Sequence, residues 1–314
     1  MTMGRGKSRE VLDLIHQMRA ILSEIQPATV RQLCYQLFDH KLIPSMGSNE
    51  TKTVSKHLTW ARQNEVVPFE WIVDEAREIE KAATWASADR LLTSVRKVYR
   101  RDRWQRQASR VLVVSEKGTI RGSVNPILDE YGLDFLAMKG FTSTTIIHDL
   151  AVSALDERRN TVLLYIGDYD PSGMFMSERD LPDRLDRYMR QAAQARGLDA
   201  HGPRPTITRV ALTKRDLTTL RHLASSRFDA EDKDEDARYQ WFIGEGGDLC
   251  CEVDAMSPPI LRRRLKAAIE PLIDREQWER EGLAERAEIQ SLDSVLSTWA
   301  GIRGQVAEYE GGPR

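Results

Sequence analysis

Cysteine and long apolar runs are scarce in this chain of 314 residues. Its three cysteines lack CxxC spacing and cannot build a disulfide framework: Cys34, Cys250 and Cys251. No apolar run approaches the roughly 18 residues of a membrane span, and the opening residues MTMGRGKSRE lack the apolar core of a signal peptide. We therefore expect a cytoplasmic protein in a reducing compartment, with no membrane partner.

The whole chain also lacks an excess of charge of one sign, since 46 Lys and Arg face 48 Asp and Glu. The two signs are unevenly distributed: residues 1–110 hold 19 basic and 13 acidic residues, whereas residues 111–314 hold 27 and 35. This asymmetry predicts an N-terminal part that faces a polyanion. Apolar residues make up 41% of the chain, which excludes a disordered protein, and the length predicts about two domains.

The first 85 residues predict a domain of short helices. Over residues 11–25, apolar residues recur at the spacing of one face of an amphipathic helix. Pro27 ends this helix, and Thr29 is a candidate N-cap for a second one. The second helix carries an apolar stripe without gaps, formed by Val30, Leu33, Cys34, Leu37 and Phe38. We expect both helices to bury one face.

A third helix is predicted from about residue 50 to residue 63, and a short strand or wing at residues 66–71 around Pro68. Three small helices followed by a strand hairpin are typical of a winged-helix domain, whose last helix usually enters a DNA groove. Candidate DNA contacts on the third helix are Lys52, Lys56 and Arg62. A helical bundle without a role in DNA binding is the alternative.

A basic linker, residues 86–110, is predicted to follow this domain. Eight Lys and Arg residues lie from Arg90 to Arg110, with one acid among them after Arg90, Asp102. Such a run is either the solvated face of a helix or a surface that contacts DNA phosphates. The candidate phosphate contacts are Arg96, Lys97, Arg100 and Arg101.

From residue 111 to residue 314 the pattern changes to strands that alternate with helices. The short, bounded apolar runs lie at residues 111–114, 134–138, 161–166 and 207–212. This alternation predicts an α/β domain with a mainly parallel sheet flanked by helices. Helices are predicted to close the chain, at about residues 258–286 and again from residue 291, and the acidic run at residues 229–236 predicts a mobile surface loop.

Carboxylates follow two of the predicted strands. Glu116 comes just after the first strand in VLVVSEKG, and Asp168 and Asp170 come just after the third in TVLLYIGDYDPSG. Ligand chemistry in parallel sheets belongs at the carboxyl ends of the strands. Two carboxylates so close together favour a bound cation, and oxygen ligands suit Mg²⁺. The alternative is that these acids only cap the helices that follow.

These motifs resemble a known fold, the metal-binding Toprim domain of topoisomerases, bacterial primases and some nucleases, which has a Glu after its first strand and a D-x-D after its third. VSEKG and DYDPSG resemble more closely the A subunit of topoisomerase VI and its relative, the meiotic double-strand-break transesterase. MKGFTS at residues 138–143 is similar to their glycine-containing turn. In TVRQLCYQL, Arg31, Leu33 and Tyr35 match the R-x-L/I-Y-Y pattern of those families, with Cys34 in place of the first tyrosine.

The resemblance implies a winged-helix domain at residues 1–85 and a Toprim domain with C-terminal helices at residues 111–314. It implies that Tyr35 is the nucleophile that cleaves double-stranded DNA by transesterification, while Arg31 steadies the developing charge. It also implies that Glu116, Asp168 and Asp170 bind catalytic Mg²⁺, and that the chain forms a nucleoid-associated homodimer. The ATPase of those families lies on a separate B-type subunit, and this chain has no Walker motif. A B-type subunit or a motor complex is thus a possible partner.

Helix geometry gives an independent expectation for Tyr35. At about 100° per residue, Tyr35 lies roughly 130° from the centre of the apolar stripe and should face outward, with Arg31 one turn before it on the same side. Two alternatives to a topoisomerase-like transesterase stay open. One is a hydrolytic Toprim nuclease of a plasmid or phage defence system, in which water replaces Tyr35 as nucleophile. The other is a DNA-binding module without catalysis.

Overall fold

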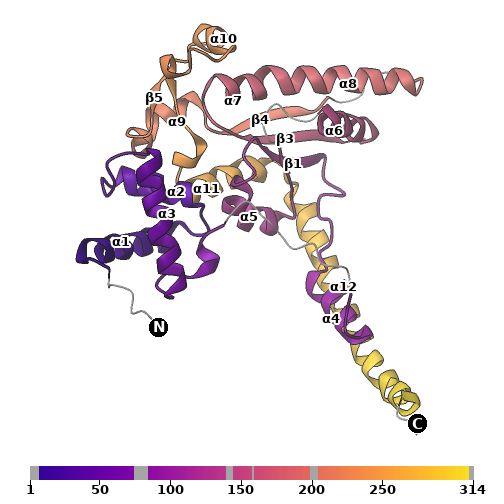
Figure 1. Ribbon diagram of the computed structural model, residues 1–314. Coiled ribbons are helices and arrows are strands. Elements are labelled where there is room, and N and C mark those ends of the chain that lie inside the picture. Colours follow the sequence, from indigo (N-terminus) through magenta and orange to yellow (C-terminus); the bar gives the residue numbers. More distant parts are fainter. Residues whose placement is uncertain (1–6, 74–83, 139–143, 158, 199–203, 311–314) are drawn as a thin grey trace. The chain divides into compact units, whose positions relative to one another are not determined.

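The computed structural model describes residues 7–73, 84–138, 144–157, 159–198 and 204–310 (Figure 1). The chain divides into two compact units, one of Met1–Ala76 with Ser109–Pro271 and one of Arg77–Ala108 with Leu272–Arg314. The first unit holds the N-terminal helices and the parallel sheet, and the second holds one helix from before the sheet and the C-terminal helix. None of the described helices is long and apolar enough to cross a membrane.

The three predicted N-terminal helices are confirmed as α1 (Arg9–Ile25), α2 (Val30–Asp39) and α3 (Ser48–Gln63). Thr29 begins α2 through a capping box. Its hydroxyl accepts from the Gln32 amide at 3.1 Å, and the Gln32 side-chain oxygen accepts from the Thr29 amide at 2.8 Å. The apolar stripes of the three helices meet in one core, which includes Ile15, Met18, Leu22, Leu33, Leu37, Val54 and Leu58.

The predicted strand or wing at residues 66–71 is wrong. The chain instead forms a 3₁₀ turn, η1 (Phe69–Trp71), in which the Trp71 amide donates to the Pro68 carbonyl at 3.3 Å. Pro68 has no amide hydrogen to give to a strand ladder, which favours a turn here. Only Ile72 pairs as in a sheet, with Ala28, in an isolated parallel bridge.

The predicted parallel sheet is confirmed in the first unit. Its strands β1 (Ser109–Ser115), β2 (Asp134–Ala137), β3 (Asn160–Ile166) and β4 (Thr206–Ala211) lie in the order β2-β1-β3-β4, and all pairs are parallel. The central strands β1 and β3 are apolar on both faces because helices cover both sides. At their carboxyl ends Ser115 is paired with Ile166, so the residues that follow these two strands emerge side by side.

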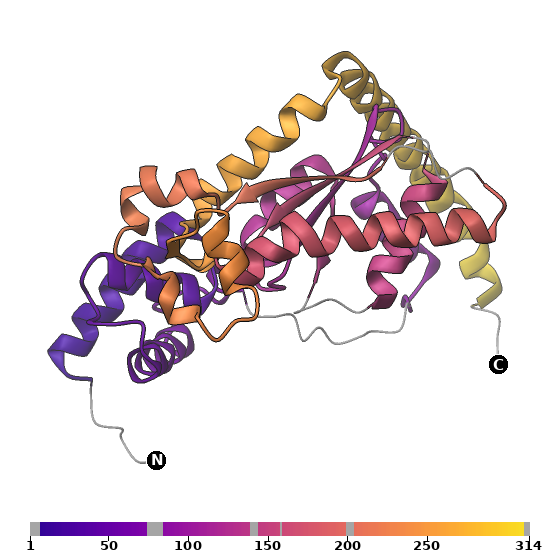
Figure 2. The same cartoon turned by 90° about the horizontal axis from the view of Figure 1, so that it is seen from above.

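Helices flank the sheet on both faces (Figures 1 and 2). On one face α6 (Thr144–Asp156) and α8 (Leu181–Ala195) bury Leu112, Val114 and Leu163. On the other lie α5 (Ile120–Tyr131) and α11 (Pro258–Ile269). Two short elements, α7 (Pro171–Phe175) and the π-helical turn η2 (Met176–Asp180), join β3 to α8.

Between β4 and α11 the chain makes an excursion of short elements. These are α9 (Lys214–Thr219), η3 (Arg221–Leu223), β5 (Phe228–Asp229), η4 (Ala230–Lys233), α10 (Tyr239–Gly244), β6 (Leu249–Cys250) and η5 (Val253–Ala255). Strands β5 and β6 pair antiparallel. The acidic run at residues 229–236 is therefore partly ordered as η4 rather than a plain loop, and Asp236 pairs with Arg238 at 2.6 Å.

The second unit pairs α4 (Ala88–Val98) with α12 (Arg275–Glu310). The segment predicted as a basic linker therefore contains a helix, and several of its arginines face acids of α12. Arg96 pairs with Asp293 at 2.8 Å, and Arg103 with Glu285 at 2.9 Å. Arg101 pairs with both Glu281 and Glu288, and Trp104 packs edge-to-face on Trp278 at 5.4 Å. The closing helices are predicted at about 258–286 and from 291. The break between them lies earlier, because α11 ends at Ile269, η6 (Glu270–Leu272) follows, and α12 begins at Arg275.

Candidate active site at the carboxyl edge of the sheet

The predicted carboxylates meet at the carboxyl edge of the sheet. Glu116 follows β1, and Asp168 and Asp170 follow β3, the neighbouring strand. Burial and then the negative charges of Asp168 and Asp170 raise the pKa of Glu116. Burial also raises the pKa of Asp168, against the opposing effect of the Lys117 ammonium. These acids are therefore close enough to repel one another, which is the electrostatic setting that attracts a cation.

The D-x-D turn itself is tightly built. The Asp170 carboxylate accepts from the Gly173 amide at 2.7 Å and so caps α7, which means that the helix-capping interpretation applies to this residue. The Asp168 carboxylate accepts from the Val253 amide at 2.7 Å instead. A Cβ atom on Gly173 would lie 2.4 Å from the Asp168 carbonyl oxygen, so the turn requires glycine at this position.

Arg209 is a buried arginine that contacts the D-x-D turn, and the sequence analysis did not single it out. Arg209 on β4 donates to the Gly173 carbonyl at 3.0 Å, to the Ser177 hydroxyl at 2.5 Å and to the Asp168 carbonyl. Burial lowers the pKa of Arg209, and the nearby Glu178 and Asp168 carboxylates counteract only part of this effect. The Arg209 guanidinium therefore links the D-x-D turn to β4 by hydrogen bonds.

Two further acids reach the same edge from a distant part of the chain. Residues Tyr169 and Cys251 form an antiparallel bridge, with their amides and carbonyls 2.9 Å apart in both directions. The bridge brings Glu252 and Asp254, which flank the start of η5, beside the D-x-D turn. Sequence reasoning missed both acids because no apolar strand of recognisable length precedes them.

Lys117 lies at the centre of these acids. Its Nζ atom is 3.0 Å from Asp168 Oδ1, 3.2 Å from Glu252 Oε2 and 2.8 Å from Asp254 Oδ2. Burial lowers the pKa of Lys117, but the three carboxylates outweigh it and hold the pKa well above its ordinary value. Asp254 is only 2% exposed, and its Oδ1 atom has no hydrogen-bond partner within the described part of the chain. We refer to Lys117, Asp168, Glu252 and Asp254 as the lysine-centred cluster.

Helix α2 lies against the lysine-centred cluster through Arg31. The guanidinium forms two hydrogen bonds to the Glu252 carboxylate, from Nε at 2.8 Å and from Nη2 at 2.6 Å. It also lies over the ring of Tyr35, with Cζ 5.7 Å from the ring centroid. The expected pairing of Arg31 with Tyr35 on one side of α2 is therefore confirmed.

The expectation that Tyr35 faces solvent is wrong. Tyr35 lies outside the apolar core of the three helices, as the helical spacing predicts, but it is only 6% exposed. The reason is that η5 packs on this side of α2, and helical periodicity does not reveal what covers the second face of a helix. Burial and the Glu252 carboxylate raise the pKa of the Tyr35 phenol, and Arg31 and Lys117 counteract only part of this effect.

Other contacts fix the helical domain to the sheet within the first unit. Arg262 on α11 donates to the carbonyls of Ile25 and Gln26 at 2.6 and 2.8 Å, where α1 ends. The Ser123 hydroxyl on α5 donates to the side-chain oxygen of Gln32 at 2.6 Å. Tyr35 and the carboxylates therefore belong to one body in this chain.

The candidate DNA-binding residues fall into two groups. Lys52 and Lys56 on α3 are exposed, and Arg62 packs its guanidinium 4.6 Å from the Phe69 ring centroid. The other group belongs to the second unit, where Arg96 and Arg101 are paired with acids of α12 and Lys97 and Arg100 are exposed. Only the α3 group shares a unit with Tyr35.

Within the described residues, no group of three or more His, Cys, Asp or Glu side chains is arranged to hold a metal ion. In the lysine-centred cluster, the Lys117 ammonium occupies the place between Asp168 and Asp254. Comparisons with known protein families, curated proteins and solved structures found no match to this chain.

Proposed function

We propose that this protein cleaves double-stranded DNA by transesterification from Tyr35, in the presence of Mg²⁺. One observation carries the proposal: an unbroken line of contacts joins Tyr35 to the D-x-D turn within one chain. It runs from Tyr35 to Arg31, from Arg31 to Glu252, and through Lys117 to Asp168. A tyrosine and an arginine held beside acids at the carboxyl edge of a parallel sheet suit phosphoryl transfer.

The reaction exchanges one phosphodiester for another. The Tyr35 phenol oxygen attacks phosphorus, a 5′-phosphotyrosyl bond forms, and the bond from phosphorus to the 3′ oxygen breaks. The phenol proton is lost and the departing 3′ oxygen gains one, which leaves a 3′-hydroxyl. Because the pKa of Tyr35 is raised, the phenolate needs cationic help, and Arg31 is the cation nearest to its ring. A DNA phosphate would compete with Glu252 for this guanidinium.

The residues at the sheet edge suit Mg²⁺ in their chemistry. Glu116, Asp168 and Asp170 supply the oxygen donors that this ion prefers. Burial raises the pKa values of Glu116 and Asp168, and the neighbouring carboxylates add to this effect. When bound, Mg²⁺ would neutralise charge on the scissile phosphate and the leaving oxygen.

The architecture proposed with this activity is a winged-helix domain and a Toprim domain like those of the topoisomerase VI A subunit. Support comes from the three-helix core, from the exposed Lys52 and Lys56 on α3, and from the acids that end β1 and β3. A homodimer and a separate ATPase or motor partner belong to the same proposal.

A second candidate, hydrolysis by a Toprim nuclease, is favoured by one observation. Tyr35 is 6% exposed and its pKa is raised, so the phenol is a poorer nucleophile than an exposed tyrosine. In that case water attacks the phosphodiester, and Tyr35 only supports Arg31.

The two candidates are separated by incubating supercoiled plasmid with the protein and Mg²⁺, with and without protease digestion. Transesterification predicts cut DNA that is bound to protein until digestion. Tyr35→Phe should then bind DNA but neither cut it nor form the adduct, whereas the control Tyr188→Phe on α8 should behave as the unaltered protein.

Cutting by Tyr35→Phe at the unaltered rate would establish hydrolysis instead. Absence of Mg²⁺-dependent nicking in the unaltered protein would overturn both candidates and leave a DNA-binding module.

A further inference from the structure

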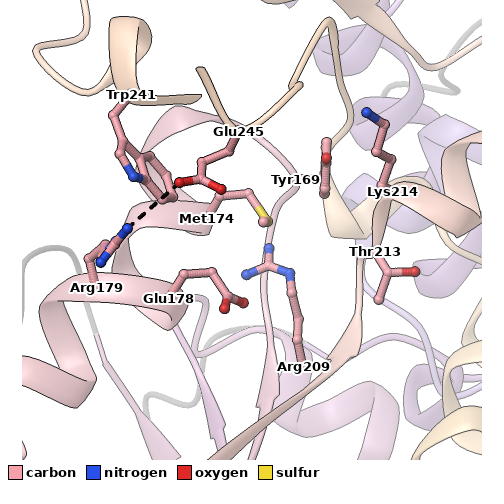
Figure 3. A pocket seen from close by; sticks show the side chains of 9 residues that line it. All are labelled: Tyr169, Met174, Glu178, Arg179, Arg209, Thr213, Lys214, Trp241 and Glu245. Carbon is pink, nitrogen blue, oxygen red and sulfur yellow. Dashed lines mark ion pairs between the residues drawn. The ribbon is translucent and has the colours of Figure 1, made fainter. Parts of the chain in front are cut away.

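A cavity of about 480 Å³ lies beside the D-x-D turn (Figure 3). Tyr169, the residue between the two acids of the turn, forms one wall, and Trp241 on α10 lines another. Met174 on α7 and the buried Arg209 also line it. Its volume is in the range that holds small ligands, which occupy cavities of roughly 300–1,000 Å³.

Two aromatic side chains of the cavity are held by neighbouring rings. Trp241 packs edge-to-face on Phe175 at 5.2 Å, and Tyr169 packs edge-to-face on Phe242 at 5.5 Å. Rings fixed in this way present a surface at little cost in conformational entropy. Aromatic side chains of this kind are suited to stack with flat, aromatic ligands, nucleobases included.

The charged groups of the cavity divide between rim and interior. Lys214 donates to the Gly246 carbonyl at 2.5 Å, and Arg179 faces Glu245 at 3.7 Å with both side chains more than half exposed. Contacts so exposed are weak and can be exchanged for a ligand anion. Arg209 by contrast is engaged by carbonyls and the Ser177 hydroxyl, so it shapes the cavity rather than binding in it.

Glu178 gives the cavity an acceptor. Its carboxylate points into the cavity near Arg209 (Figure 3), and its Oε1 atom is 3.3 Å from the Ser177 hydroxyl. A carboxylate accepts hydrogen bonds only, so it favours a base with an exocyclic amino group. Thymine has no exocyclic amino group, and its N3–H donor lies between two carbonyl oxygens that a carboxylate repels.

We propose that this cavity binds a single nucleotide whose base carries an amino group. The base lies against Trp241 and Tyr169, its amino group donates to Glu178, and its phosphate is bound by Lys214. The nucleotide is either free or an unpaired nucleotide of DNA. The second source rests on the proposed function, since the cavity shares the D-x-D turn with the carboxylate edge.

Binding of free nucleotides to the full-length protein, followed by titration calorimetry, tests the site without any need for cleavage. We expect 2′-deoxyadenosine 5′-monophosphate to bind about tenfold more tightly than deoxyadenosine and than thymidine 5′-monophosphate. Deoxyadenosine lacks the phosphate for Lys214, and the carbonyl oxygens beside N3–H of thymine repel the Glu178 carboxylate. Lys214→Gln should abolish the preference for the monophosphate over the nucleoside, and Glu178→Gln should abolish the preference for adenine over thymine.

The matched control is Lys266→Gln, because Lys266 pairs with Glu130 away from the cavity. It should change neither preference. Failure of all three compounds to bind at millimolar concentration, or binding that Lys214→Gln and Glu178→Gln leave unchanged, would overturn the proposal.

The source of the nucleotide is tested with a duplex that contains 2-aminopurine in an unpaired position. DNA is the source if the unaltered protein quenches the fluorescence of the 2-aminopurine and the double variant Trp241→Phe, Lys214→Gln does not. A free nucleotide is the source if the protein binds the monophosphate but does not quench the duplex. Nucleotide binding without Mg²⁺-dependent nicking would refute the proposed cleavage only. Nicking without nucleotide binding would refute the cavity proposal only.

Discussion

Replacement of Lys117 by methionine tests the lysine-centred cluster. Methionine keeps most of the length of the side chain and removes its charge. The change leaves Asp168, Glu252 and Asp254 without the ammonium that lies within 3.2 Å of all three. Arg31 then still faces two of these acids, since it pairs with Glu252 at 2.6 Å and lies 3.9 Å from Asp254.

The expected loss follows from burial. Asp254 is 2% exposed, and removal of one partner from a buried pair costs about 3–5 kcal/mol because the other charge stays buried without compensation. Since Arg31 and backbone amides still face these acids, we expect the lower end, about 3 kcal/mol. A typical domain has only about 5–15 kcal/mol of stability in total, so the effect is easily measured.

Urea unfolding at pH 7 is the assay. Lys117→Met should lower the urea midpoint while the dependence on urea stays the same, which marks a change in stability alone. Lys266→Met is the matched control, because Lys266 pairs with Glu130 on an exposed surface. It should leave the midpoint unchanged.

The pH dependence gives a second, independent check. The pKa of Asp168 is already raised, and loss of the ammonium raises it further. A carboxyl with a raised pKa binds its proton more tightly in the folded state, so the folded variant gains stability as pH falls. The difference between the two proteins should therefore shrink between pH 8 and pH 5. In the unaltered protein the raised pKa of Lys117 keeps the ammonium charged throughout this range. Equal stability at pH 7, or a difference that grows on acidification, would refute the reasoning.

Two further predictions concern DNA. Asp168→Ala and Asp170→Ala should each abolish Mg²⁺-dependent nicking but still shift duplex DNA in a gel, and unaltered nicking by both would exclude these acids from catalysis. Replacement of Lys52 and Lys56 by glutamine should weaken DNA binding and reduce the slope of log affinity against log salt by about 0.9 for each DNA phosphate that is no longer neutralised. The same measurement on Arg96→Gln with Arg101→Gln should show a smaller change, because α12 already pairs these arginines; equal slopes for the two pairs would contradict this.

Much of the fold was predictable from local patterns. The apolar runs that form β1 and β3 are bounded by polar residues and are too short for helices, which predicts strands. Their alternation with helices predicts that the two strands pair in parallel, as the structure shows. Thr29 is predictable as the N-cap of α2 from residues within one helical turn, and in the structure it forms a capping box with Gln32. The acids after β1 and β3 were predictable for the same reason, since they depend only on where two strands end.

Features that depend on distant residues were not predictable. Val253 reaches Asp168 across 85 positions through an isolated bridge, so Glu252 and Asp254 carry no local signal for their place beside the D-x-D turn. The burial of Tyr35 also depends on distant residues. Tyr35 lies on the side of α2 opposite its apolar stripe, and η5 covers that side.

The pairing of α4 with α12 has a consequence for the order of folding during synthesis. Arg96 and Asp293 are 197 positions apart, and Arg101 and Glu281 are 180 apart. When α4 leaves the ribosome, its partner helix does not yet exist, and the whole sheet is made in between. None of the residues of α4 is buried even in the complete structure, so the isolated helix has little to stabilise it. The second unit is therefore expected to form last, after the sheet has folded, and α4 remains open to proteases and chaperones until α12 has emerged.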